Sequence, residues 1–162
     1  MERAMELAVR IARLEAVEAI RQLKARYFHS CDSKNPDAMR ECFVSGPVDI
    51  DYGALGRFTD RDGLVRLFTQ LGCHPHIVEM HHGANPDIAI IDADHAHGTW
   101  SLHYQQIDTV KQTVTQLGAF YHDAYRREDG VWKISATRCA VTSCAMLSIA
   151  EGMPRVLHAG AA

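Results

Sequence analysis

The chain has 162 residues and a mass of 18.1 kDa, a length typical of one domain with a hydrophobic core of its own. A hydrophobic fraction of 47% and a charged fraction of 23% exclude intrinsic disorder for most of the chain. The formal net charge of −3 gives no basic footprint for nucleic acid, and no apolar run is long enough to span a membrane.

The cysteines do not form a zinc-binding or disulfide framework. Their number, five, is odd, and no two of them have the close spacing of a zinc module. The first ten residues mix Glu and Arg with apolar residues and lack the apolar core of a signal peptide. We therefore expect reduced thiols and a cytoplasmic location.

A long helix is expected at the start of the chain, because residues 1–29 contain neither Pro nor Gly and are rich in strong helix formers. Its apolar residues form two stripes on nearly opposite faces. Since one small core cannot cover both faces, either the helix breaks near residues 13–15 or its first turns dock on another subunit. The stripes comprise Leu7, Ile11 and Leu14, and Ala16, Ile20, Leu23 and Tyr27.

The next segments predict two shorter helices with a strand between them. Asn35 is a good N-cap and Pro36 suits a first helical turn, so a short helix is expected over 37–43. A strand follows over 48–52, then a glycine-bracketed turn. A helix over 61–71 is expected to begin after Thr59 or Asp60 and to end at Gly72.

The second half of the chain predicts strands over 77–84, 87–91, 96–107, 114–127 and 131–144. Asp129-Gly130 between the last two is a hairpin signal, and Asn85-Pro86 separates the first two. Helices first and long antiparallel strands second indicate an α+β fold. A long curved sheet wrapped around the N-terminal helices makes a cone whose mouth is a ready pocket.

Ten histidines are a high number for this length. Three close pairs invite a metal interpretation: His74 and His76, His81 and His82, and His95 and His97. The plainer interpretation is a set of solvated histidines at the rim of the sheet, and we predict no metal site.

His81 differs because it lies inside an apolar run, 77–83. His81 and His82 point to opposite faces of a strand, so at most one faces the interior. A buried imidazole needs a hydrogen-bond acceptor, and Asp32 at the end of the first helix is a candidate. A carboxylate that orients an imidazole makes its far ring nitrogen a better proton acceptor. The alternative is a core histidine with its hydrogen bonds satisfied.

Three segments, in order, resemble the NTF2-like superfamily, specifically its SnoaL-like branch. They are residues 19–37, 80–86 and 118–134, which read AIRQLKARYFHSCDSKNPD, MHHGANP and GAFYHDAYRREDGVWKI. Together the resemblance covers roughly residues 15–140. The branch includes scytalone dehydratase, bile-acid dehydratase and hexachlorocyclohexane dehydrochlorinase.

The resemblance implies a set of catalytic roles. In those enzymes an aspartate at the end of the first helix supports a histidine that removes a proton during elimination, which places these roles on Asp32 and His81. Tyr27 matches a helix tyrosine that hydrogen-bonds substrate, and Tyr52 matches a second pocket tyrosine. Arg127 matches a position that contacts the departing group. The alternatives are core packing for the tyrosines and a solvated strand-end charge for Arg127.

The sequence also departs from the pattern. Tyr104 stands where the bile-acid enzyme has an acidic residue, and Val141 stands near that enzyme's late arginine, with Arg138 three positions earlier. Substrate identity therefore does not transfer. The predicted catalytic residues are His81, Asp32 and Tyr27; the predicted substrate-binding residues are Tyr52, Tyr104, Arg127, Phe68 and Trp100.

These observations predict one NTF2-like domain over 1–145 and a part-helical tail over 146–162. The expected function is that of a lyase or isomerase without a cofactor, acting on a small apolar molecule that is steroid-like, polyketide-like or aromatic. His81 would be the general base. We expect a homo-oligomer, a dimer or trimer, with no nucleic-acid or membrane partner.

Two alternatives stay open. The first is isomerisation with Asp32 as the base and a tyrosine oxyanion hole. The second is a protein without catalysis: a ligand-binding module, or a structural partner like the small subunit of a ring-hydroxylating dioxygenase. Fold alone does not decide between them.

Overall fold

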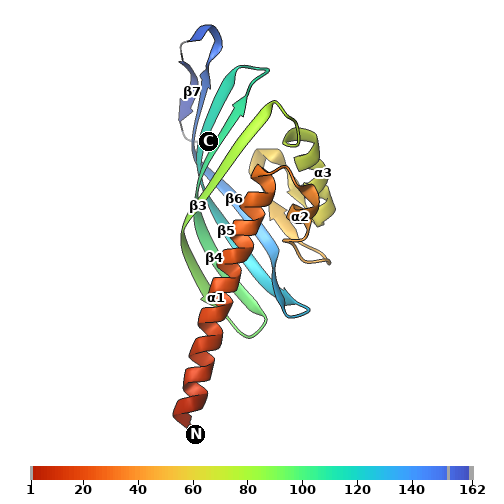
Figure 1. Cartoon of the computed structure of the whole chain (residues 1–162), viewed down its shortest axis with the longest axis vertical. Coiled ribbons are helices and arrows are strands. Elements are labelled where there is room, and N and C mark those ends of the chain that lie inside the picture. Colours follow the sequence, from red (N-terminus) through yellow and green to blue (C-terminus); the bar gives the residue numbers. More distant parts are fainter. Residues whose placement is uncertain (1, 153, 161–162) are drawn as a thin grey trace.

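The computed structural model describes residues 2–152 and 154–160 of the chain. This part holds a curved sheet with three α-helices on one side (Figure 1). The helices are α1 (Glu2–Asp32), α2 (Pro36–Arg40) and α3 (Arg61–Leu71), with 3₁₀ turns η1 (Gly53–Leu55) and η2 (Ala150–Gly152). The strands are β1 (Asp49–Asp51), β2 (Arg57–Phe58), β3 (Ile77–Ile90), β4 (His95–Asp108), β5 (Thr113–Glu128), β6 (Val131–Ser148) and β7 (Arg155–Gly160).

The strands pair in the order β2-β1-β6-β5-β4-β3, and β7 pairs with the far end of β6. All these pairs are antiparallel except β1 with β6. The sheet curves without closing, and α1 crosses its concave face (Figure 1). The α+β cone expected from the sequence is confirmed.

Helix α1 does not break between its two apolar stripes. The buried stripe begins at Ala16 and continues through Ile20, Leu23 and Tyr27, which contact the sheet. The first stripe remains exposed; Leu14, for example, is 70% accessible. Figure 1 shows the reason, because the first turns of α1 extend past the end of the sheet.

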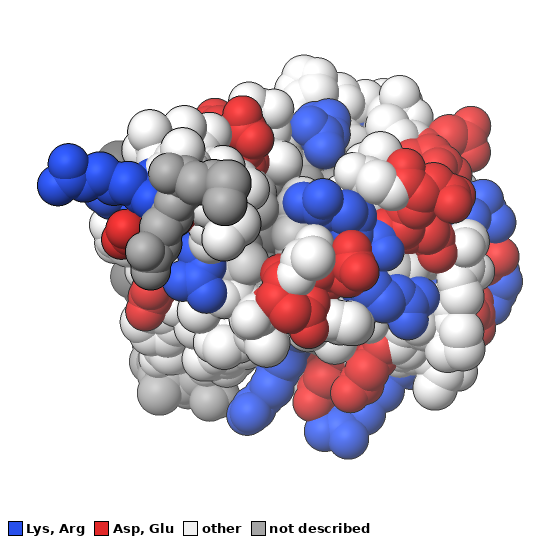
Figure 2. Space-filling model, turned by 90° about the horizontal axis from the view of Figure 1, so that it is seen from below, with Lys and Arg blue, Asp and Glu red and all other residues white. Residues whose placement is uncertain are grey.

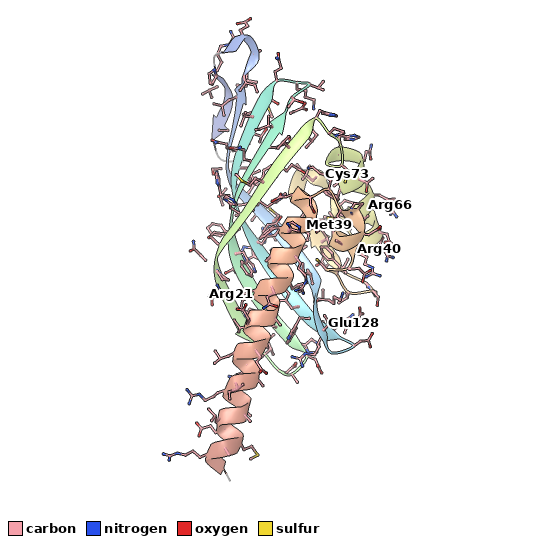
Figure 3. The ribbon with its side chains drawn as sticks, in the orientation of Figure 1. Arg21, Met39, Arg40, Arg66, Cys73 and Glu128 are labelled. Atoms are coloured by element: carbon pink, nitrogen blue, oxygen red, sulfur yellow. The ribbon has the colours of Figure 1, made fainter. Side chains whose placement is uncertain are left out.

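The helix caps agree with the sequence. The Asn35 side chain accepts a hydrogen bond from the Ala38 amide, and Asp60, one of two expected caps for α3, accepts from the Gly63 amide. Arg40 and Arg66 lie on the outer surface of α2 and α3 (Figure 3). The two helices also carry the buried Met39 and Leu64, which pack into the hydrophobic core.

Two strands expected around Asn85-Pro86 are one strand, β3, with a bulge. The pairing with β4 shifts between Ala84 and Asp87, and Asn85 adopts a φ of 50°. A bulge absorbs the proline, which cannot donate a ladder hydrogen bond, and β3 lies at the edge of the sheet, where proline is tolerated. The expectation of a break here was wrong because a bulge and a turn share the same residue types.

The Asp129-Gly130 hairpin formed as expected, with φ of 52° and 79°, both in the left-handed region that a tight two-residue turn requires. The segment 146–162 is mainly extended in its described part: β6 continues to Ser148, only η2 is helical, and β7 then returns along β6. Gly152, with a φ of 73°, permits this reversal.

A buried ion pair joins α1 to the middle of the sheet. The Lys24 Nζ lies 2.7 Å from Asp123 Oδ2, and both side chains are essentially inaccessible to solvent. Asp123 also accepts hydrogen bonds from the hydroxyls of Tyr125 (2.8 Å) and Thr137 (2.7 Å). The ammonium group lies 3.6 Å from the ring centroid of Tyr121. A shift of α1 along its axis would separate the two buried charges, so the pair fixes the axial position of α1 on the sheet.

Charges of both signs alternate on the surface seen from the end where α1 begins (Figure 2). No single-sign field covers this face, which agrees with a net charge of only −3. In the described residues, no helix combines the length and the hydropathy that crossing a membrane would take.

Candidate active site

A cavity of about 900 Å³ lies between the second half of α1, the segment from β1 to α3 and the concave face of the sheet. Its walls are mostly aliphatic and aromatic, as expected for a site that takes an apolar molecule. The apolar lining includes Leu55, Leu64, Leu67, Phe68, Leu71, Leu102, Leu117 and Val141. The polar lining includes Tyr27, Tyr52, Glu79, His81, Tyr104 and Gln106, with Arg57 and Arg138 toward β1.

The structure brings Asp32 and His81 together at this cavity. Asp32 ends α1, and His81 projects from β3 on the concave face. Asp32 Oδ1 lies 2.6 Å from His81 Nδ1, and Asp32 Oδ2 accepts the backbone N–H of His81 at 3.1 Å. Because an ionised carboxylate only accepts, Nδ1 carries a proton, and in the neutral ring Nε2 presents a lone pair. The imidazole is thus held in the tautomer that can take a proton.

Two rings hold the imidazole in place. Phe28 stacks on His81 with ring centroids 5.8 Å apart and an interplanar angle of 16°, and Tyr104 lies 4.7 Å away on a tilted plane. Phe28 can approach this closely because position 83 is a glycine. A Cβ on Gly83 would lie 2.2 Å from a ring carbon of Phe28, which no relaxed contact permits.

Tyr27 and Tyr52 meet hydroxyl to hydroxyl, with their oxygens 2.6 Å apart. Burial raises the pKa of both phenols, so both stay protonated throughout the physiological range. The pair holds two hydrogens, and one lies between the two oxygens. The other is free to bind an oxygen of a ligand in the cavity.

A second polar cluster joins Tyr104, a predicted substrate-binding residue, to Glu79, Lys34 and Gln106, which were not predicted from the sequence. The Tyr104 hydroxyl donates to Glu79 Oε1 at 2.7 Å, Gln106 Nε2 donates to the Tyr104 oxygen at 3.0 Å, and Lys34 Nζ pairs with Glu79 Oε2. A signal was present: Glu79 lies two residues before His81, and Gln106 two residues after Tyr104. Alternate strand residues share a face, so both had to face the cavity.

Phe68 lines the cavity as predicted, but two other predicted substrate-binding residues do not. Trp100 is buried in the core, where its Nε1 donates to the Tyr125 hydroxyl at 2.8 Å. Arg127 lies beside the β5–β6 hairpin, with its guanidinium 4.9 Å from the ring centre of Trp132. Trp100 lies on the predicted face of its strand, but it lies too deep in the cone to reach the cavity, because core side chains fill this part of the cone.

Cys31, Cys139 and Cys144 also line the cavity, and all five cysteines are free. Burial, reinforced by the Glu79 carboxylate, raises the pKa of the Cys31 thiol to about 12. A thiol in this state is not ionised near neutral pH and is a poor nucleophile. Among the cavity's groups, the imidazole is therefore the better placed base.

The paired histidines of the sequence do not gather into a metal site within residues 2–152 and 154–160. No cluster of three or more His, Cys, Asp or Glu side chains in this part could hold an ion. His74 and His76 stack on each other, and His95 forms an exposed pair with Asp92, 3.0 Å apart.

Residues 12–138 of the chain match the SnoaL-like domain. Three solved structures show the same fold. A protein of Novosphingobium aromaticivorans provisionally assigned as a scytalone dehydratase is 20% identical over 82% of this chain and 88% of its own, with a TM-score of 0.76.

The second is a hexachlorocyclohexane dehydrochlorinase, LinA type 2, which is 18% identical over 91% of this chain and 94% of its own, also with a TM-score of 0.76. The third, an NTF2-like protein with a cystatin-like fold from N. aromaticivorans, is 20% identical over 83% and 87%, with a TM-score of 0.69. The domain match covers most of the sequence, and the cone has the architecture of these structures. The chain belongs to the SnoaL-like domain family and has the NTF2-like fold.

Proposed function

We propose that the chain is a lyase or isomerase that needs no cofactor and acts on a small apolar ring compound. The observation that carries the proposal is the 2.6 Å contact between Asp32 and His81 at the edge of a cavity with apolar walls. Family members include enzymes of elimination, such as the dehydrochlorinase named above. A substrate of this class would fit a cavity of about 900 Å³.

In the proposed reaction, His81 Nε2 removes a proton from a carbon next to an electron-withdrawing group. The Asp32 carboxylate stabilises the imidazolium that forms and keeps the ring in position. The free hydrogen of the Tyr27–Tyr52 pair binds the oxygen on which negative charge develops. The bond to the leaving group then breaks, and its electron pair leaves with the hydroxide or halide; in an isomerisation the proton returns to another carbon.

The hydrogen bonds of Asp32 argue against the alternative in which Asp32 itself is the base. Both of its oxygens hold His81, one at the ring and one at the backbone. An attack by Asp32 on substrate would require it to release the imidazole. The same carboxylate is well suited to a supporting role.

Product masses test this proposal. The protein is incubated with a panel of cyclic ketones and alcohols that carry a hydroxyl or halogen β to an acidic C–H, in D₂O. Elimination gives a product lighter by water or hydrogen halide. Isomerisation gives a new compound of the same composition, which carries deuterium where the removed proton exchanges with solvent. Tight binding with neither change, across the panel, would identify a non-catalytic binding protein and reject the proposal.

We also propose that the chain assembles with copies of itself through the first turns of α1. Leu7, Ile11 and Leu14 lie on one stripe with helical spacing and are 46–70% exposed, whereas a stable monomer rarely leaves such a stripe uncovered. The flanking Arg and Glu residues supply charges of both signs, which suits a second copy better than a partner of one charge.

Deleting residues 1–14 is expected to lower the oligomeric mass while leaving the fold intact, because burial in the core begins at Ala16. Analytical ultracentrifugation measures the mass, and circular dichroism checks the fold. An unchanged mass in the truncated protein would contradict this assembly.

A further inference from the structure

Glu79 is a cavity carboxylate that the proposed reaction does not use. Its side chain is only 9% exposed, and Lys34, at 24%, is its charge partner through Oε2. Its other oxygen, Oε1, accepts the Tyr104 hydroxyl at 2.7 Å. Lys34 holds the Glu79 carboxylate in place, and a charged acceptor forms a strong hydrogen bond. The hydroxyl hydrogen of Tyr104 is therefore fixed in the direction of Glu79 Oε1.

The hydrogen bonds of Tyr104 determine what it can offer a ligand. A phenol has one hydrogen and two acceptor positions on oxygen. The hydrogen points to Glu79, which has none to give in return, and Gln106 Nε2 occupies one acceptor position at 3.0 Å. One acceptor position remains, on a side chain that lines the cavity. Tyr104 can therefore accept a hydrogen bond from a ligand but cannot donate one.

The Tyr27–Tyr52 pair has the opposite character, since it keeps one hydrogen to donate. The two tyrosine sites thus present one donor and one acceptor to the same cavity. A carbonyl or ether oxygen is suited to the first site. A hydroxyl is suited to the second, and a halogen or ether there would leave the acceptor of Tyr104 without a partner, which is costly in a buried site.

We propose that Tyr104, oriented by Glu79 and Gln106, forms a subsite that binds a hydroxyl group of the ligand as a hydrogen-bond acceptor. The ligands favoured by this site are apolar ring compounds with a free alcohol or phenol, and their methyl ethers and halides bind more weakly. This inference relies on the proposed function only in placing the substrate in this cavity. It defines the substrate class by a hydroxyl group that can donate a hydrogen bond to Tyr104.

Two probes test the subsite by binding alone. 2-Naphthol carries a hydroxyl, and 2-methoxynaphthalene has the same ring with the hydrogen replaced by methyl. Isothermal titration calorimetry on the full chain is expected to show about tenfold tighter binding of 2-naphthol, the effect of one buried hydrogen bond. Equal or tighter binding of the methyl ether by the wild-type protein would overturn the subsite.

The variant Glu79→Gln is expected to change Tyr104 from a hydrogen-bond acceptor toward the cavity into a hydrogen-bond donor. Lys34 needs an acceptor, so the amide oxygen of the new side chain faces Lys34 and its NH₂ faces Tyr104. The Tyr104 oxygen then accepts from two amides, and its hydrogen turns toward the cavity. The preference for 2-naphthol is expected to fall to parity or to invert. A preference that survives this change contradicts the proposal.

Controls separate this subsite from the base. Glu18→Gln removes an exposed carboxylate of α1 and is expected to keep the wild-type preference. His81 Nε2 is another acceptor, so loss of the preference in His81→Ala with retention in Glu79→Gln would show that the hydroxyl binds the imidazole, and would overturn the subsite. Should Glu79→Gln fail to fold by circular dichroism, Tyr104→Phe serves instead, with the expected result that affinity for 2-naphthol falls toward that of the ether.

The outcome also distinguishes this proposal from the proposed function. A wild-type protein that prefers 2-naphthol but converts no member of the ketone and alcohol panel keeps the subsite and loses the catalytic role. A protein that converts the panel but shows no preference loses the subsite alone.

Discussion

Replacing His81 by alanine is expected to lower turnover by about 10²–10⁴-fold, the usual contribution of a general base, with a native circular dichroism spectrum. The fold should survive because the imidazole faces a cavity, and because Asp32 still accepts the backbone N–H of residue 81 after the ring is removed. The measurement is kcat with a substrate found in the product-mass assay.

Asp32→Asn is expected to cause a loss of similar order. An amide can accept from only one of the two N–H groups that Asp32 now holds, and it carries no charge to stabilise the imidazolium. This variant tests orientation and charge separately from the presence of the base.

The next residue along β3 provides a matched control. His82 projects from the opposite face of the sheet, where it lies beside His103 on β4 with ring centroids 6.5 Å apart. His82→Ala is expected to keep turnover within about twofold of wild type, since surface changes away from the site have small effects. Full turnover in His81→Ala, or an equal loss in His82→Ala, would reject the role given to His81.

The variant Lys24→Met is expected to lower the free energy of unfolding by about 3–5 kcal/mol, because it leaves the Asp123 carboxylate buried without its counter-ion. Methionine keeps most of the length of the side chain, so the lost charge dominates the effect. Urea denaturation followed by circular dichroism gives the free energy.

The double variant Lys24→Met with Asp123→Asn is expected to recover part of this loss, since no unpaired charge remains and the hydroxyls of Tyr125 and Thr137 can still bond the amide. Arg21→Met is the exposed control on the same helix, because its partner Glu18 lies 3.9 Å away and both side chains are more than half exposed. A change there of under about 1 kcal/mol is expected. Equal effects at Lys24 and Arg21 would contradict the account of the buried pair.

Periodicity in the sequence predicted much of this fold. The helical spacing of the stripe that begins at Ala16 and the alternation along β4 and β5 place the buried residues correctly. The need of an inward imidazole for a hydrogen-bond acceptor made Asp32 a candidate partner of His81, and the resemblance to the SnoaL-like branch implied the pair. The structure brings the two residues together across a sequence separation of 49.

Other features depend on distances that sequence spacing does not contain. The bulge at Asn85 and the depth of Trp100 in the cone result from how the curved sheet packs, not from which face a residue takes. Glu79 could have been found by alternation, but its pairing with Lys34 arises because the chain turns back after α1 to meet β3. Local pattern gives the face of a strand, whereas depth and partners come from the tertiary structure.

The sequence separation of 99 between Lys24 and Asp123 has a consequence for how the protein is made. A ribosome completes α1 long before it adds the strand that carries the counter-ion. During most of translation, Lys24 and the apolar stripe that begins at Ala16 therefore lack the sheet residues that later cover them. A nascent chain stalled before β5 should therefore remain bound to chaperones, and protease resistance should arise only when the β5–β6 hairpin has left the exit tunnel.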